Sequence, residues 1–195
     1  VQRKTDELLF VGRLVEKKGV QFLLEAMPAV LKKHSTVRLI LAGSGPMEQE
    51  LRQQAQRLQI SDRVSFLGMV SQTELPAMYR KATLAIFPFI VAKSGDQEGF
   101  GLVQVEAMGC ECPIIAGDLP AIHDIVIHEE NGLIVESGNI RALADAIIQT
   151  LDDKDLRLKL AEKARMQVME RFDWEVIAGK YGKIYQALLH SLIVK

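Results

Sequence analysis

The sequence has few cysteines, no long apolar run and no large excess of either charge. Its 195 residues include 2 Cys, and Cys110 and Cys112 are separated by one residue, with no second pair. That spacing fits neither a zinc ribbon nor a disulfide scaffold, so we expect two reduced thiols in a cytoplasmic protein. No apolar run reaches the roughly 18–20 residues of a membrane span, and the N-terminus lacks the basic-then-apolar order of a signal peptide.

The charge balance argues against nucleic acid as the main partner. The net charge is −1, and the 24 Lys and Arg residues are dispersed along the chain. A nucleic-acid-binding surface normally needs a concentrated basic patch. The hydrophobic content of 48% suffices for one α/β domain over residues 1–195, and a second full domain would not fit. Because a strand is predicted almost directly after Val1, we expect the chain to be part of a longer protein.

Apolar runs of strand length alternate with amphipathic segments of helix length along the chain. Strands are predicted at 7–12, 36–42, 63–67, 84–87, 113–116 and 132–135. Helices are predicted at 20–33, 47–58, 71–79, from about 100, at 122–125, 139–151, 153–171 and 174–192. This order predicts an α/β fold with a Rossmann-like, doubly wound parallel sheet of about six strands, covered by helices on both faces.

Two finer expectations follow from the helical segments. Ser71 and Glu74 form a Ser-x-x-Glu pattern, which is typical of a capping box at a helix start. The apolar residues of the last two helices recur at helical spacing and are predicted to belong to the core. These stripes are Leu156, Leu160 and Ala164, followed by Ile177, Ile184 and Leu188.

The most informative stretch is a glycine-bearing loop, residues 95–101, that leads into an apolar helix. The helix is predicted to begin near Phe100. Gly99 and Gly101 let the backbone approach a ligand closely. The first N–H groups of a helix have no intrahelical partner and lie at the positive end of its dipole, so this junction suits a phosphate.

Glu98 and Glu106 lie on either side of this junction, with Glu106 expected about two turns inside the helix. A helical rise of about 1.5 Å per residue would separate their backbones by roughly 10–12 Å. The two carboxylates of a glycosidase lie about 5–9 Å apart, so this spacing indicates two contacts along one long ligand. Alternatively, Glu98 complements the helix dipole and Glu106 is an exposed helical residue.

Other candidates follow the first two strands, where a doubly wound sheet binds its ligands. Arg13 and Lys18 can together neutralise a diphosphate and stabilise a departing phosphate, or they belong to a solvated basic loop. The turn at 43–46, Gly-Ser-Gly-Pro, lacks the third Gly of a dinucleotide fingerprint, so it lies beside a nucleotide base or is purely structural. His123 and His128 are five residues apart, and no metal site is predicted.

Taken together, these motifs resemble the donor-sugar-binding half of retaining GT-B glycosyltransferases, family 4 or "group 1". The run from Glu98 to Glu106 matches the family's E-x7-E signature. Residues 11–20 match its G-R-L…K-G segment, residues 41–46 its A-G-x-G-P turn and residues 131–135 its N-G-L-L-V strand. The resemblance covers nearly the whole chain and keeps the order and spacing of these motifs.

The resemblance implies a domain that binds a UDP-, GDP- or ADP-sugar for retaining transfer of the glycosyl group, without a metal or another cofactor. Arg13 and Lys18 would bind the diphosphate and stabilise the leaving group, and Glu98 would contact the transferred sugar. Glu106 would hold the ribose hydroxyls. The donor-binding residues that the resemblance implies are Gly12, Gly43, Val70, Gly99, Phe100, Gly101, Leu102 and Glu106.

The chain departs from the family in two ways. It has Gly-Asp-Leu-Pro-Ala at 117–121 where the family often has Gly-Gly-x-Pro-Glu, so no acidic contact is expected there. The family's N-terminal domain is absent, so the acceptor, whether a sugar, a lipid-linked sugar or a small molecule, would bind outside this chain. The isolated domain is therefore expected to be inactive.

Two other functions stay open from the sequence. One is a non-catalytic nucleotide-binding or interaction module, and the other is an epimerase or phosphorylase with the same two-domain plan. A cytoplasmic location is expected, with peripheral association at the inner face of the membrane left open for the full-length protein.

Overall fold

The computed structural model describes residues 6–193 and the side chains of residues 6–189. Six strands form one sheet in the order β3-β2-β1-β4-β5-β6, and every neighbouring pair is parallel. The strands are β1 (Glu7–Val11), β2 (Arg38–Ala42), β3 (Val64–Gly68), β4 (Leu84–Phe87), β5 (Ile114–Gly117) and β6 (Leu133–Val135). The predicted doubly wound sheet is confirmed.

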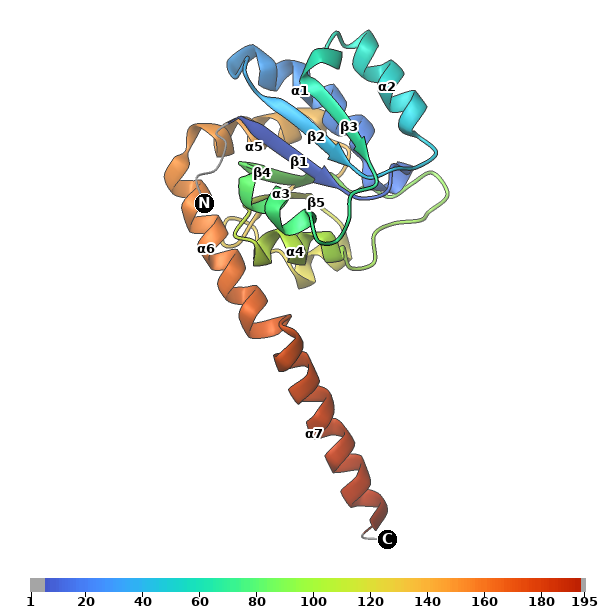
Figure 1. Ribbon diagram of the computed structural model, residues 1–195, viewed down its shortest axis with the longest axis vertical. Helices are drawn as coiled ribbons and strands as arrows, with labels where there is room; N and C mark the ends of the chain where they lie inside the picture. The colour runs from blue at the N-terminus through green and yellow to red at the C-terminus, as the bar shows by residue number, and fades with distance from the viewer. Residues whose placement is uncertain (1–5, 194–195) are drawn as a thin grey trace.

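Helices cover both faces of this sheet (Figure 1). On one face lie α1 (Val20–Lys33), α2 (Glu48–Arg57) and α5 (Ile140–Asp152). On the other lie α3 (Leu75–Lys81) and α4 (Leu102–Gly109), with α6 (Lys154–Arg171) packed along α4. The last helix, α7 (Trp174–Ile193), points away from this body (Figure 1). Three short 3₁₀ helices are η1 (Glu16–Lys18), η2 (Ser61–Arg63) and η3 (Pro120–Asp124).

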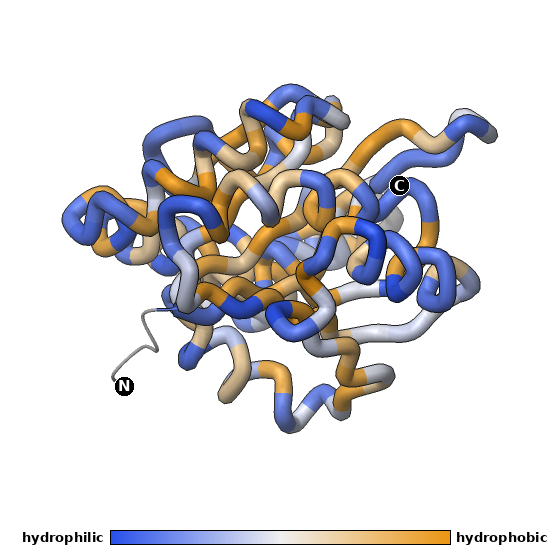
Figure 2. Tube along the Cα trace, turned by 90° about the horizontal axis from the view of Figure 1, so that it is seen from above, coloured by the Kyte–Doolittle hydropathy of each residue, from blue (hydrophilic) through white to orange (hydrophobic). Residues whose placement is uncertain are grey.

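The core consists of two layers separated by the sheet. In β1, Leu8 and Phe10 pack with the helices of one face, whereas Leu9 and Val11 pack with those of the other. Successive strand residues point to opposite faces, so a strand covered on both sides must be apolar at every position. Hydrophobic stretches accordingly cross the middle of the domain in Figure 2.

The strand order reverses between β1 and β4, and the loops that follow these strands are packed together. The Ile90 N–H donates to the Lys17 carbonyl at 3.0 Å. Gly19 has φ +71°, and a Cβ there would lie 1.7 Å from the Pro88 carbonyl oxygen. Ligands of open α/β sheets bind at such a switch in strand order. The fold therefore places the loops that carry Arg13, Lys18 and Glu98 at the expected edge.

Three predicted element starts are wrong by a few residues. Helix α4 begins at Leu102, because Gly101 takes a left-handed conformation with φ 75° as its N-cap, and Glu106 is thus just over one turn inside the helix. Helix α3 begins at Leu75, with Glu74 as its N-cap. Of the predicted capping box only one half is present: the Ser71 N–H donates to the Glu74 carboxylate at 3.2 Å, but the Ser71 hydroxyl also donates to this carboxylate, at 2.6 Å, and caps no backbone amide in the described part of the chain. The second strand begins at Arg38.

The predicted core stripes are confirmed in α6 and wrong in part of α7. Leu160 and Ala164 are buried, but Ile184 and Leu188 are each 55% exposed. Helical spacing shows that a helix has an apolar face and does not show what covers that face. Among the described residues, no helix combines the length and the apolarity that crossing a membrane requires.

We expect Gly43→Ala to destabilise the fold. Gly43 has φ +143°, and a Cβ there would lie 1.8 Å from the Gly12 carbonyl oxygen. Backbone strain of this kind costs about 1–3 kcal/mol, and relief of the clash adds to that cost. Denaturant unfolding should therefore show a lower midpoint. Gly99→Ala is the control, since a Cβ at Gly99 meets nothing within 4 Å and its stability should match that of the wild type.

Candidate functional site

A pocket of about 380 Å³ lies at the carboxyl ends of β1 and β2 and reaches the first turns of α4. Its walls come from the loops after β1, β2 and β3 and from the side of α4. Six of the residues predicted from the sequence line it: Gly12, Arg13, Gly43, Val70, Leu102 and Glu106. Residues from four separate parts of the chain are thus gathered around one cavity of the size of a ligand site.

The glycine turn after β2 forms part of the wall because it lies against the loop after β1. The Gly43 N–H donates to the Gly68 carbonyl at 2.7 Å, and the Leu14 N–H donates to the Ser44 carbonyl at 2.9 Å. A Cβ at Gly45 would lie 2.3 Å from the Leu14 carbonyl oxygen. The turn therefore needs glycine for packing, and the same packing brings its backbone to the pocket.

Glu106 faces the pocket from α4 and is half-buried. The Tyr79 hydroxyl donates to its carboxylate at 3.4 Å. Burial raises the pKa of Glu106 above its usual value, and the hydrogen bond from Tyr79 offsets only part of that effect. Burial and the nearby Glu106 charge raise the pKa of Tyr79, so its phenol stays protonated. Glu106 is therefore a pocket residue with a hydrogen-bond donor behind it, and not an ordinary exposed helical residue.

Lys18 and Glu98 form an ion pair beside this pocket. The Lys18 ammonium donates to the Glu98 carboxylate, and the two side chains are only 13% and 14% exposed. The Lys18 Nζ lies 4.6 Å from the centre of the Phe89 ring, where a cation–π attraction is expected. A Cβ at Gly12 would lie 3.8 Å from the Lys18 Cε, so the lysine stem runs past a residue of the pocket wall.

The surroundings of Glu98 favour its ionised form. Burial alone would raise the pKa of this carboxyl. The hydrogen bond and charge of Lys18, with the N–H groups of Phe100 and Gly99, more than offset burial and lower the pKa below its usual value. The Gly99 N–H donates to Glu98 Oε1 at 3.2 Å. Glu98 and Glu106 therefore belong to one signature but have pKa values displaced in opposite directions.

The structure thus divides the predicted residues into two neighbouring groups. None of the other five residues lines the pocket: Lys18 and Glu98 form the ion pair, the Gly99 and Phe100 N–H groups donate to Glu98, and Gly101 is the N-cap of α4. The sequence did not reveal that the predicted phosphate ligand Lys18 and the predicted sugar ligand Glu98 contact each other.

Three further residues were missed as parts of the site. Tyr79 and Phe89 are buried and look like ordinary core residues in the sequence. Lys17 looks like one more surface charge, but its ammonium contacts Asp96 at 3.1 Å and the Gln97 carbonyl at 3.3 Å. No local pattern indicates these contacts, because each joins residues at least 27 positions apart.

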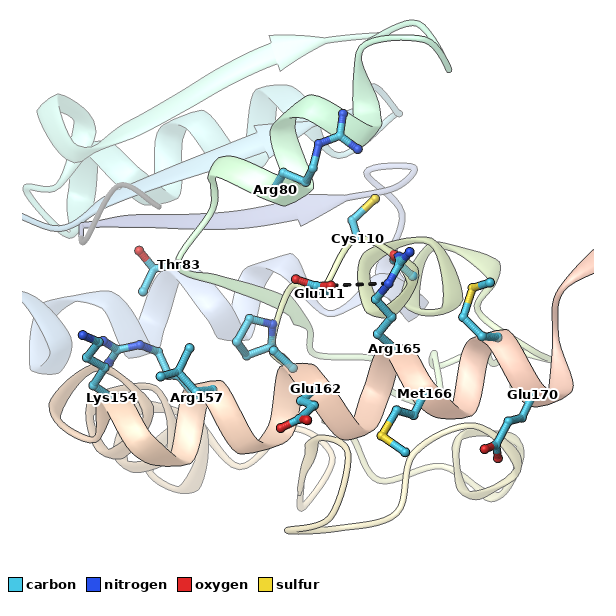
Figure 3. Close-up of a pocket in the computed structure, with 15 residues that line it drawn as sticks. Arg80, Thr83, Cys110, Glu111, Lys154, Arg157, Glu162, Arg165, Met166 and Glu170 are labelled. Carbon is cyan, nitrogen blue, oxygen red and sulfur yellow. Dashed lines mark hydrogen bonds and ion pairs between the residues drawn. The ribbon is translucent and has the colours of Figure 1, made fainter. Parts of the chain in front are cut away.

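A larger hollow of about 1240 Å³ lies at the other end of the strands (Figure 3). Its residues Thr83 and Pro113 directly precede β4 and β5. Charged groups there serve the fold: Arg165 contacts Glu111 at 3.3 Å, and Arg157 donates to two carbonyls at the end of α5. None of the predicted site residues lines it. The smaller pocket is the candidate site because ligands of such sheets bind at the carboxyl ends of the strands.

Comparison with known families identifies the family of this chain. The family described as "Glycosyl transferases group 1" matches residues 2–167. The chain belongs to this family. It is a C-terminal domain of the GT-B fold, and the family's enzymes retain the anomeric configuration. The expectation drawn from the sequence motifs is confirmed at this level.

Relatives of known name cover nearly the whole chain. It is 32% identical over 171 residues to a GDP-mannose-dependent alpha-(1-6)-phosphatidylinositol monomannoside mannosyltransferase of Mycobacterium tuberculosis, covering 87% of this chain and 44% of that protein. The chain spans about half the length of the curated relatives it matches.

Solved structures share the fold. HepE of Anabaena, crystallised in complex with UDP and glucose, superposes with a TM-score of 0.80 at 26% identity, covering 93% of this chain and 48% of that one. The C-terminal domain of the group 1 glycosyl transferase LpcC of Francisella tularensis superposes with a TM-score of 0.76 at 27% identity. That match covers 87% of both chains.

We expect Glu98→Gln and Glu106→Gln to change thermal stability in opposite directions at neutral pH. A lowered pKa means that ionised Glu98 stabilises the fold above its unfolded-state pKa, so Glu98→Gln should lower the melting temperature. A raised pKa means that ionised Glu106 destabilises the fold, so Glu106→Gln should raise the melting temperature.

Thermal unfolding over a range of pH checks both signs. The gain of Glu106→Gln should disappear as the pH falls below the ordinary glutamate pKa of about 4.3. The loss of Glu98→Gln should persist at that pH and disappear only as the pH falls through the lowered pKa of Glu98. Shifts of the same sign in both variants would contradict the electrostatic account.

Proposed function

We propose that this chain binds a nucleotide-diphospho-sugar and is the donor domain of a retaining glycosyltransferase. The observation that carries the proposal is the single pocket that unites Arg13 with Glu106, next to the Lys18–Glu98 pair. Cations, backbone amides and carboxylates are gathered at this edge of the sheet, as an extended anionic ligand with sugars at its two ends would require.

Glu106 is the proposed ligand of the ribose. An ionised carboxylate accepts hydrogen bonds from two neighbouring hydroxyl groups, and Tyr79 holds this one in place from behind. The base lies between the Gly43 turn and the loop that carries Val70 in this proposal, since both line the same pocket as Glu106. The pocket volume of about 380 Å³ is within the range of ligand sites.

Arg13 and Lys18 are the proposed diphosphate ligands. A guanidinium binds phosphate oxygens in a planar fork, and an ammonium supplies a compact second charge. With the amides of Phe100 and Gly101 they would stabilise the negative charge that develops on the departing nucleoside diphosphate. We propose that these groups do so without a divalent metal, and that Glu98 contacts the transferred sugar.

The relatives support a nucleotide sugar as the ligand class. The mycobacterial relative is named for GDP-mannose, and HepE is described with UDP and glucose. We propose that residues 1–195 form one donor domain, which agrees with the match to the isolated LpcC domain. The acceptor, a sugar, a lipid-linked sugar or a small molecule, would bind to a further domain of the longer protein.

Calorimetric titration without metal tests the proposal. UDP, GDP, ADP and their common sugar conjugates would be titrated into the chain, and we expect saturable binding of one nucleotide. Arg13→Ala should weaken it by about 10- to 100-fold, the value of one charge-assisted hydrogen bond of about 1.5–3 kcal/mol. Glu106→Ala should weaken binding of the nucleoside part by a similar factor.

Arg141→Ala is the matched control. Its guanidinium lies on α5, 3.8 Å from Asp145, and is largely exposed. This variant should bind like the wild type. Equal losses for Arg13→Ala and Arg141→Ala would show that only overall charge matters. If no nucleotide binds the folded wild-type chain, the proposed donor site is wrong for this chain.

An assay of the full-length protein separates transfer from the other functions of this fold. Glycosyl transfer to an added acceptor, lost in Lys18→Ala, is the expected result. Product formation without an acceptor would indicate an epimerase, and dependence on inorganic phosphate would indicate a phosphorylase. Nucleotide binding with no turnover would indicate a non-catalytic module.

A further inference from the structure

The Glu98 carboxylate already occupies two of the groups that the proposed function assigns to phosphate, the Lys18 ammonium and the Phe100 N–H. It accepts hydrogen bonds from the Lys18 ammonium and from the N–H groups of Gly99 and Phe100. These donors lie just before the N-terminus of α4, where the helix dipole favours an anion. The free protein thus places an anion of its own in the proposed phosphate site.

Contacts of Lys17 and Phe89 flank this ion pair. Lys17, the neighbour of Lys18, contacts Asp96 at 3.1 Å and the Gln97 carbonyl at 3.3 Å. The Phe89 ring lies beside the Lys18 ammonium. Because the Lys18–Glu98 pair is 13% and 14% exposed, water screens it less than a surface pair. A phosphate that binds Lys18 must therefore displace a well-placed competitor.

A second observation concerns Gln104, whose buried carboxamide lacks hydrogen-bond partners within the described chain while Glu98 is bound to Lys18. Gln104 of α4 is 0% exposed, and neither its Oε1 nor its Nε2 has a hydrogen-bond partner among the described residues. Its carboxamide is directed at the phosphate loop: a Cβ at Gly101 would lie 2.3 Å from the Gln104 Nε2. A buried carboxamide without partners costs free energy, so the site contains polar capacity that the free arrangement leaves unused.

We propose that Glu98 is a built-in competitor for the donor's phosphate, and that donor binding exchanges it for phosphate on the Lys18 ammonium and the Phe100 N–H. The inference rests on the proposed function. The exchange releases the Glu98 carboxylate toward the sugar that follows the phosphate. The exchange also shifts the segment at Gly101. The Gln104 carboxamide then forms a hydrogen bond with the backbone of this segment or with the bound ligand.

This exchange couples two events in the site. Glu98 is free to meet the sugar only when phosphate occupies Lys18, so the acidic group is placed only after the donor is bound. The affinity for the nucleoside diphosphate is therefore lower than it would be without Glu98, because part of the free energy of phosphate binding offsets the loss of the Glu98 contacts.

Calorimetric titration of nucleoside diphosphates into Glu98→Gln tests the competition. UDP, GDP and ADP would be the probes, each without a sugar, so that loss of a contact between Glu98 and the sugar does not enter. We expect the nucleotide that binds the wild type to bind Glu98→Gln about tenfold more tightly, since the charged competitor is gone. Lys18→Met should bind more weakly than the wild type.

Asp96→Asn is the matched control, because it removes the same charge from the same loop. Asp96 contacts Lys17 and is exposed, so its removal should change affinity less than twofold. If Asp96→Asn and Glu98→Gln increased nucleotide affinity equally, the increase would be due to the overall charge of the protein, and the inference would be overturned. Unchanged or weaker binding in Glu98→Gln would overturn it while leaving the donor site intact. Failure of every nucleotide to bind any variant would overturn the proposed function as well.

Gln104→Leu tests the second arrangement separately. We expect its melting temperature to equal or exceed that of the wild type, because an unpaired buried carboxamide is lost. We expect its nucleotide affinity to fall severalfold, because the partner formed on binding is also lost. A lower melting temperature with unchanged affinity would show that Gln104 serves the free arrangement, and would contradict the proposed shift at Gly101.

Discussion

Close backbone contact between the loops at the carboxyl edge of the sheet is the constraint on which the rest of the site depends. The loop after β1 lies against the turn after β2 on one side and against the start of the β4 loop on the other. Side chains do not fit at these contacts: a Cβ would come within 1.7 Å of a carbonyl oxygen at Gly19 and within 1.8 Å at Gly43. Backbone groups and the ends of long side chains therefore form the site.

This constraint explains why the charges of the site are so close together. Arg13 and Lys18 are carried by a loop that is fixed on both sides, and the β4 loop brings Glu98 to Lys18 across its contact with Lys17. Glu106 lines the pocket from α4, about one turn after the start of this helix at Leu102. Burial is the largest effect on both carboxyl groups. At Glu106 it prevails and raises the pKa, whereas at Glu98 the hydrogen bond and charge of Lys18, with the Phe100 and Gly99 N–H groups, together outweigh it and lower the pKa.

The sequence predicted the sheet because its strands are mostly apolar and alternate with helices. It also predicted six of the thirteen residues that line the pocket, because the topology of such a sheet dictates which loops meet. It could not predict the left-handed N-cap at Gly101 or the exposed face of α7, because local periodicity does not show how a chain turns or what covers a helix. The Lys18–Glu98 contact was equally hidden, since residues 80 positions apart meet there.

The groups proposed to bind phosphate differ in kind from those proposed to bind the base and the sugar. In the proposed function, phosphate is bound by backbone amides and two cations, which suit any nucleoside diphosphate and carry no information about the base. Side chains of other chemical types lie in two other loops. Met69 and Gln72 are on the pocket wall after β3, and the loop of residues 88–98 lies beside the ion pair. The proposed function therefore assigns discrimination between bases and between sugars to these two loops, and binding of the diphosphate to the backbone of the fold.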